Sequence, residues 1–184
     1  MAVLPTRRLA IKDGEVEVRS LREEEAGQIL DFARTTFEVS PFVLTASGEF
    51  KMTLDEEIAF IRKNIESPTS LFLAACEGGR IVGSLALTGH PRRKIRHQAV
   101  IGMMVAEDRR GRGVGRALLR AVIDWAREHP TLEILTLAVF PANVPAYELY
   151  RSMGFIEYGR LPGALRNDDG VVYDNADMYL RVKP

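Results

Sequence analysis

Cysteine and long apolar runs are almost absent from this sequence of 184 residues. The single cysteine, Cys76, cannot form a disulfide within the chain. Its place between Ala75 and Glu77, at the end of an apolar run, favours a packed thiol over a nucleophile. No run is as long as a membrane span, and the start of the chain lacks an apolar stretch long enough for a secretory signal. We therefore expect a cytoplasmic protein.

Net charge and metal-ligand patterns are lacking as well. Lys+Arg and Asp+Glu each total 25, so no overall positive field favours nucleic acid or an anionic membrane, and we expect neither as a partner. The three histidines, His90, His97 and His129, lack ligand spacing with cysteine or carboxylates, so no metal is expected. The length suits one domain that spans residues 1–184.

The sequence does contain a short uncharged run, a glycine-rich turn and an amphipathic pattern in succession. Ala99–Val105 fits a buried strand. Glycines in Arg110–Gly115 permit positive φ and let backbone N–H groups converge, and apolar residues then recur at helical spacing from Val114. A helix N-terminus with free N–H groups is a candidate phosphate site, which nearby arginines would assist: Arg110, Arg112 and Arg116.

Two familiar phosphate loops do not match this turn. A nucleoside-triphosphate loop needs a Lys-Ser/Thr pair after its glycines, and none is present. A dinucleotide loop needs Gly-x-Gly-x-x-Gly, whereas Gly111, Gly113 and Gly115 are spaced Gly-x-Gly-x-Gly. Taken alone, the turn could also be a glycine-rich helix start that binds nothing.

Two blocks of sequence resemble the GNAT superfamily of acyl-CoA-dependent N-acetyltransferases. Arg110–Gly115 resembles the cofactor motif Gln/Arg-x-x-Gly-x-Gly/Ala. About 30 residues later, Asn143–Phe155 resembles the helix and Gly-Phe strand start that follow this motif in the family. The resemblance is strongest from about Arg80 to Phe155. It implies an α/β (α+β) fold with a mixed, mostly antiparallel sheet of about seven strands flanked by helices.

The resemblance also implies a reaction: direct transfer of an acetyl group from acetyl-CoA, as co-substrate, to a primary amine of a small molecule or peptide. Such attack requires loss of an amine proton, a donor to the oxyanion, and a proton or hydrogen bond for the departing thiolate. In the family a tyrosine serves the thiolate, which falls on Tyr150 here, with Tyr147 as the rival phenol. A backbone N–H at about Met103 to Val105 would serve the oxyanion.

The expected cofactor-binding residues come from both blocks. Asn143 and Tyr150 are two helical turns apart on a helix starting near Val144, so both can face the same cofactor. Asn143 can also serve as the N-cap of that helix. The full expected set is Met103, Met104, Val105, Arg110, Gly111, Arg112, Gly113, Val114, Gly115, Arg116, Asn143 and Tyr150.

The proton acceptor is where this sequence departs from better-understood family members, which carry a Glu or His inside the central strand. Ala99–Val105 has no titratable residue. Counting by twos back from Val105 places His97 on the same face, so His97 joins Tyr150 as a candidate catalytic residue. A water chain to bulk solvent or to a backbone carbonyl is an equal alternative.

Two other functional classes stay open at this point. The missing carboxylate is compatible with a non-catalytic acyl-CoA-binding sensor or regulatory module. A nucleic-acid or protein-interaction module is disfavoured by the neutral charge and the lack of a basic stripe. Many members of the resembled family are dimers, so the resemblance also allows a homodimer.

Local patterns predict the remaining elements. Glu15–Ser20 alternates as a strand, and Ser20 with Glu23 forms a capping box that opens a helix to about Phe37. The aromatic segment Phe37–Phe50 either covers an acceptor pocket or plugs the core edge. The other expected features are an N-cap at Thr53, a hairpin around Glu77–Gly79, a basic loop at His90–His97, a helix ending near His129, a strand at Leu132–Val139 and two tail strands between Gly154 and Val182.

Overall fold

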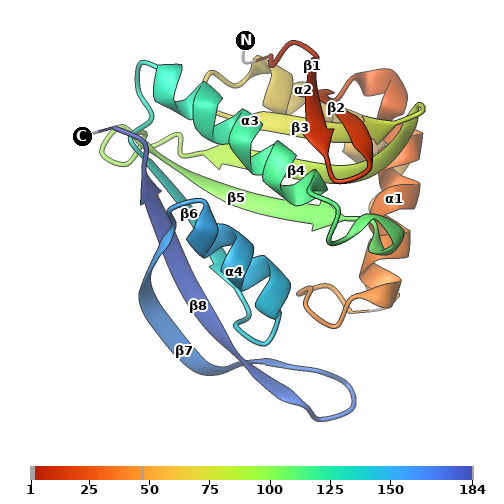
Figure 1. Cartoon of the computed structure of the whole chain (residues 1–184), viewed down its shortest axis with the longest axis vertical. Helices are drawn as coiled ribbons and strands as arrows, with labels where there is room; N and C mark the ends of the chain where they lie inside the picture. Colours follow the sequence, from red (N-terminus) through yellow and green to blue (C-terminus); the bar gives the residue numbers. More distant parts are fainter. Residues whose placement is uncertain (1–2, 47, 184) are drawn as a thin grey trace.

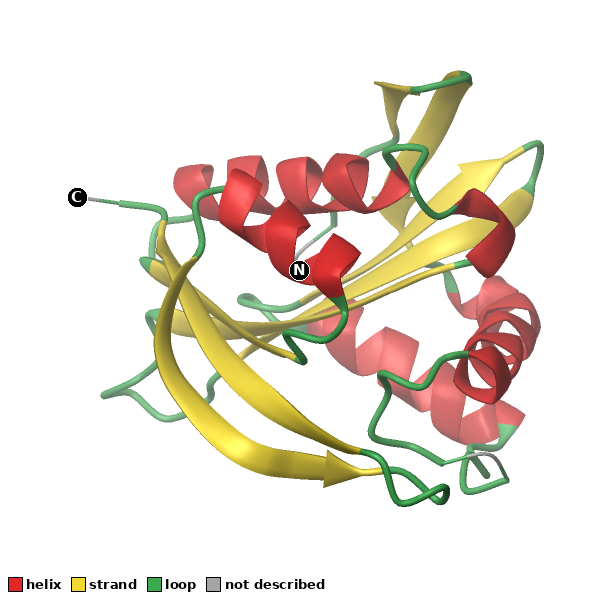
Figure 2. Ribbon diagram, turned by 60° about the horizontal axis from the view of Figure 1, so that its bottom comes forward, coloured by secondary structure: helices red, strands yellow, loops and turns green. Residues whose placement is uncertain are grey.

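An eight-stranded twisted sheet runs through the computed structural model, which describes residues 3–46 and 48–183 (Figures 1 and 2). The strand order is β1-β2-β3-β4-β5-β6-β8-β7, and all neighbouring strands are antiparallel except β5 and β6. The predicted mixed, mostly antiparallel sheet is therefore confirmed, with eight strands instead of about seven.

The elements follow in chain order as strands, four α-helices and two short 3-10 helices (η1 and η2). Their bounds are β1 (Arg7–Ile11), β2 (Gly14–Ser20), η1 (Glu23–Glu25), α1 (Ala26–Val39), α2 (Leu54–Glu66), β3 (Leu71–Glu77), β4 (Arg80–Gly89), β5 (Gln98–Val105), η2 (Glu107–Arg109), α3 (Val114–Glu128), β6 (Ile134–Val139), α4 (Val144–Ser152), β7 (Ile156–Arg166) and β8 (Val172–Arg181).

The predicted capping box at Ser20 is wrong. Ser20 is the last residue of β2, and its Oγ accepts a hydrogen bond from the backbone N–H of Leu4 at 2.9 Å. The chain turns instead at η1, where the Glu25 carboxylate accepts from the backbone N–H of Arg22 at 3.1 Å. Because β2 pairs with β1 and β3, Ser20 is held in extended conformation and cannot open the helix. Strand β1 itself was not predicted.

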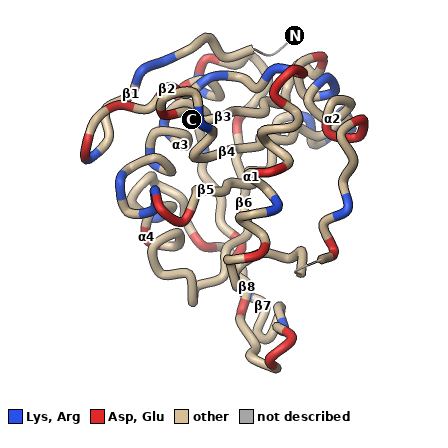
Figure 3. The backbone as a smooth tube through the Cα atoms, turned by 90° about the vertical axis from the view of Figure 1, so that its right-hand side faces the viewer, with Lys and Arg blue, Asp and Glu red and all other residues tan. Residues whose placement is uncertain are grey.

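Other local predictions are confirmed. Thr53 caps α2, since its Oγ1 accepts from the N–H of Glu56 and the Glu56 carboxylate accepts in return from the N–H of Thr53. The β3–β4 hairpin turns at Gly78 and Gly79. Strands β7 and β8 form the expected C-terminal pair, which projects from the body of the molecule (Figure 3).

Two hydrophobic layers hold the sheet between its helices. Helices α3 and α4 pack on one face, and α1 and α2 pack on the other (Figure 1). Side chains alternate between the layers along each central strand: Leu71 and Leu73 of β3 join the α3 side, whereas Phe72 and Ala74 join the α1–α2 side. Cys76 is buried in the second layer, which confirms the packed thiol.

The two halves of the sheet separate between β5 and β6. These parallel strands pair only where Gln98–Val100 lies beside Ile134–Thr136. Beyond this point β5 stays with β4 up to Val105, while β6 continues with β8 and the C-terminal strands curve away (Figure 2). The second half of β5 therefore has an edge without a neighbouring strand, and that edge opens into the site described next.

Candidate functional site

A groove of about 1250 Å³ occupies the gap between the diverging strands. It extends from the glycine-rich turn, past the ends of β5 and β6 and the start of α4, to the segment after α1 and to β7 and β8. Every predicted cofactor-binding residue lines this groove except Arg112. The structure thus brings together two sequence blocks that are separate in the chain.

The glycine-rich turn presents free backbone donors at the start of α3. Gly111 and Gly113 have φ of 70° and 101°, a left-handed conformation that favours glycine. The backbone N–H groups from Gly111 to Arg116 donate to no acceptor in the described part of the chain. Free N–H groups at a helix N-terminus, with the positive end of the helix dipole, suit a phosphate group.

The turn is held from outside by the β1–β2 hairpin. The backbone N–H of Lys12 donates to the carbonyl oxygen of Arg112 at 2.9 Å, and the Arg112 guanidinium pairs with Asp13 at 3.1 Å. Arg112 therefore faces this hairpin and not the groove. The expectation that Arg112 assists the phosphate site depends on local sequence alone, which does not predict β1 or the pairing with Asp13.

Gly113 and Gly115 of the turn are required for different structural reasons. A Cβ on Gly113 would lie 3.6 Å from Ile11, an ordinary contact, so its positive φ is what reserves this position for glycine. A Cβ on Gly115 would come within 3.1 Å of Leu149 Cδ2 and 3.3 Å of Met103 Cε. Gly115 thus permits the close packing of α3 against α4 and β5.

Tyr150 and Tyr147 have opposite surroundings. Tyr150 lines the groove, is only 6% exposed, and packs edge-on against Phe155. Burial raises the pKa of Tyr150 to about 12, and its hydroxyl donates to no group in the described chain. Tyr147 lies outside the groove lining, and its hydroxyl donates to Glu157 at 2.6 Å, a bond that raises the Tyr147 pKa. Of the two phenols, Tyr150 is the one available in the groove.

Asn143 stands at the N-cap position of α4 without capping it. Its side chain makes no capping hydrogen bond, although its backbone carbonyl accepts from the N–H of Tyr147 at 3.0 Å. Since Asn143 also lines the groove, its carboxamide is left for a bound molecule.

His97 does not join the other predicted site residues. It precedes β5, where its carbonyl oxygen accepts from the N–H groups of Glu133 and Ile134 at 2.8 and 3.1 Å, and it does not line the groove. Val105 lies at the opposite end of β5, roughly 25 Å further along at about 3.3 Å per residue. The alternation along the strand predicts which face His97 lies on, but it does not say how far His97 lies from the groove.

The groove is also lined by residues outside the expected cofactor-binding set, some of which belong to the aromatic segment Phe37–Phe50. The segment Ser40–Leu44 lines it together with Leu161, Ala164 and Asn175. Phe42 contacts the ring of Tyr173 in β8, with ring centroids 5.3 Å apart. Phe37 and Phe50 pack on each other instead. One part of the aromatic segment thus lines the groove, while Phe37 and Phe50 pack against each other. A cover over an acceptor pocket stays a prediction.

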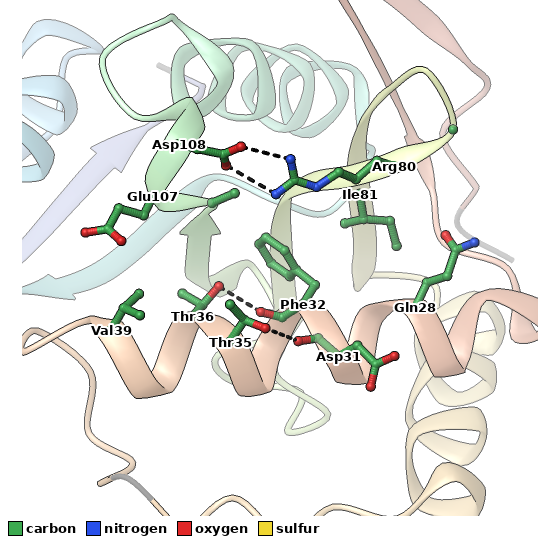
Figure 4. A pocket seen from close by; sticks show the side chains of 12 residues that line it. Gln28, Asp31, Phe32, Thr35, Thr36, Val39, Arg80, Ile81, Glu107 and Asp108 are labelled. Atoms are coloured by element: carbon green, nitrogen blue, oxygen red, sulfur yellow. Dashed lines mark hydrogen bonds and ion pairs between the residues drawn. The ribbon is translucent and has the colours of Figure 1, made fainter.

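A second pocket, of about 660 Å³, adjoins the groove and shares Thr36 with it (Figure 4). It lies between α1, the β3–β4 turn and η2. Arg80 and Asp108 close one side with paired hydrogen bonds of 2.9 and 3.2 Å, while the hydroxyls of Thr35 and Thr36 bond back to their own helix. This pairing leaves the Arg80 guanidinium bound to a carboxylate at the rim.

Comparison with known proteins identifies the family. Residues 31–155 match the model of the family described as "Acetyltransferase (GNAT) family". The chain belongs to the GNAT acetyltransferase family. This GNAT chain is 35% identical over 112 residues to the L-amino acid N-acetyltransferase AaaT of Escherichia coli (strain K12), a match covering 60% of this chain and 67% of that protein.

Two further comparisons agree. The chain is 32% identical over 122 residues to the N-alpha-acetyltransferase RimI of Mycobacterium tuberculosis, covering 61% of this chain and 75% of that protein. The yncA structure from Salmonella typhimurium, with its cofactor acetyl-CoA, superimposes with a TM-score of 0.80 at 18% identity, covering 92% and 95% of the two chains. That likeness shows the fold. The predicted GNAT fold and acyl-CoA-dependent N-acetyltransferase activity are confirmed.

The described helices include none with the length and hydropathy to cross a membrane. Basic and acidic residues are interspersed along the backbone (Figure 3).

Proposed function

We propose that this single-domain enzyme works in the cytoplasm and transfers an acetyl group from acetyl-CoA to a primary amine of a small molecule or peptide. The observation that carries the proposal is one groove that holds both the N–H groups of Gly111–Arg116 and the hydroxyl of Tyr150, which have no hydrogen-bond partner among the residues that the structure describes. The N–H groups bind the pyrophosphate, with Arg110 and Arg116 beside it. The pantetheine arm passes Asn143 and lies along the free edge of β5.

The thioester lies in this proposal beside Met103, Met104 and Val105. The amine nitrogen attacks the thioester carbon, the carbon–sulfur bond breaks, and a backbone N–H of β5 stabilises the oxyanion. Tyr150 donates a hydrogen bond to the departing sulfur. With a pKa of about 12 against about 8.5 for a thiol, full proton transfer from Tyr150 would cost about 5 kcal/mol. Tyr150 therefore acts as a hydrogen-bond donor, and the thiolate takes its proton from water.

The amine proton leaves through water in this mechanism. The interior of β5 carries no titratable residue, and His97 lies away from the groove. An alkyl amine with pKa near 10.4 requires roughly 4.6 kcal/mol to become neutral at pH 7, so the rate rises with pH as the neutral fraction increases. The acceptor enters between Ser40–Leu44 and β8. AaaT acts on L-amino acids and RimI on α-amines, which supports both free amino acids and peptide N-termini as candidates.

An acceptor screen tests the proposal. Free thiol released from acetyl-CoA is measured with each of the twenty L-amino acids, a short peptide beginning with alanine, and spermidine. We expect at least one amine to support turnover and Tyr150→Phe to lower kcat about a hundredfold, while the Kd for CoA rises much less, because only one hydrogen bond to its sulfur is lost. Tyr147→Phe is the matched control and keeps kcat within about twofold. Binding of acetyl-CoA without release of thiol for any amine would contradict the enzyme and favour a sensor.

A further inference from the structure

Two polar side chains on β8 form a pair at the far end of the groove. Asn175 Nδ2 donates to Asp177 Oδ1 at 2.9 Å. The residues lie two apart on one strand and so share a face, whereas the intervening Ala176 and the next residue, Met178, are fully buried in the core on the α3 side. Asn175 lines the groove. The pair therefore sits on the open face of the sheet.

The Asp177 carboxylate fixes which way the Asn175 carboxamide points. A carboxylate accepts hydrogen bonds, so the carboxamide must direct its NH₂ group toward Asp177. The reversed orientation would put the Asn175 carbonyl oxygen against a carboxylate oxygen. Asn175 Oδ1 accepts no hydrogen bond from any group in residues 3–46 and 48–183. One acceptor atom is thus oriented but unused.

The surroundings place this atom at the acceptor end of the groove. Tyr173, two residues before Asn175, touches Phe42 of the segment that follows α1. Asp177 pairs across the sheet with Ala138 of β6, which lines the groove where β6 diverges from β5. The glycine-rich turn lines another part of the groove, at the start of α3. Asn175 is therefore positioned between the covering segment and the free edge of β5.

We propose that Asn175 binds the acceptor amine through Oδ1 and that Asp177 is the positioning residue that holds the carboxamide in this orientation. The inference rests on the proposed acetyl transfer and names a residue that recognises its acceptor. A primary amine that attacks a thioester must point its lone pair at the carbonyl carbon, so its N–H groups must point away from that carbon. A carbonyl oxygen accepting one N–H fixes that rotation, and the nearby carboxylate makes the oxygen a better acceptor.

The test is steady-state kinetics with the best amine from the acceptor screen. Asn175→Ala is expected to raise KM for the amine about tenfold, with KM for acetyl-CoA and Kd for CoA unchanged, because one hydrogen bond to the acceptor is lost. Asp177→Ala is expected to raise KM for the amine about threefold, since the Asn175 carboxamide is then free to rotate. The double variant should be no worse than Asn175→Ala alone, because Asp177 acts only through Asn175.

Controls separate this role from a structural one. Asn167→Ala makes the same deletion in the β7–β8 turn, outside the groove lining, and should leave KM for the amine unchanged. If Asn175→Ala fails to fold, Asn175→Ser is measured by the same readouts. An unchanged amine KM, or additive effects in the double variant, would overturn the inference while wild-type turnover still supports the enzyme. Absence of wild-type turnover would instead overturn the proposed function.

Discussion

The two ends of the groove are built in different ways. The cofactor end consists mainly of backbone: N–H groups from Gly111 to Arg116 and the free edge of β5 after Val100. The acceptor end consists of side chains from α1, the segment after it, β7 and β8. A site made of backbone N–H groups needs glycines at fixed spacing, so it can be recognised as a local pattern in the sequence. A site made of side chains from distant segments has no such local pattern.

The difference has a functional consequence. The acetyl donor, which all reactions of such an enzyme share, is bound mainly by backbone N–H groups, which most side-chain substitutions leave in place as long as the turn keeps its conformation. The acceptor is bound by groups that a substitution can remove, so Phe42, Asn175 and their neighbours are where specificity can change without loss of the donor site. Variants at the cofactor end should therefore change Kd for CoA, and variants at the acceptor end should change KM for the amine.

The largest effect is expected at the cofactor end for Gly113→Val. A β-branched residue cannot comfortably adopt a φ of 101°, so the turn should distort and Kd for CoA should rise more than tenfold, at a cost of about 1–3 kcal/mol in folding free energy. Calorimetric titration with CoA measures the first quantity and chemical unfolding the second.

The matched control for Gly113→Val is Gly170→Val. Gly170 has φ of 85° in the distant β7–β8 turn, with open space where a Cβ would stand. It should lose a similar amount of folding free energy but bind CoA as the wild type does. Equal CoA affinity in both variants would show that the turn geometry does not support the phosphate site.

The same contrast decides how much of the site could be predicted from the sequence. Local spacing predicts the strand Ala99–Val105 and the helix from Val114, whereas Tyr150 comes from the resemblance to the GNAT family. The structure places all three around the groove. The Ser20 capping box failed because its hydroxyl is bound by Leu4, which a local pattern cannot register. The sequence does not reveal Asn175, because alternating polar residues are typical of the solvent-exposed face of any strand.

A smaller effect is expected for Arg112→Ala. Arg112 pairs with Asp13 on the β1–β2 hairpin and does not line the groove, so Kd for CoA should change less than about threefold. The exposed ion pair contributes up to about 1 kcal/mol to folding. Arg116→Ala is the comparison, because Arg116 does line the groove and should weaken CoA binding more. Equal losses of CoA affinity would mean that Arg112 turns toward the phosphate when CoA binds.

The smallest effect is expected for His97→Ala, at neither end of the groove. His97 lies beside β6 at the start of β5, away from the groove. The pH–rate profile of His97→Ala should therefore superimpose on that of the wild type. Both profiles should rise toward the pKa of the amine. Tyr150, with its pKa raised to about 12, stays protonated and should add no falling limb below about pH 11. Loss of an acidic limb in His97→Ala would instead show that a proton path runs the length of β5 from the groove to this histidine.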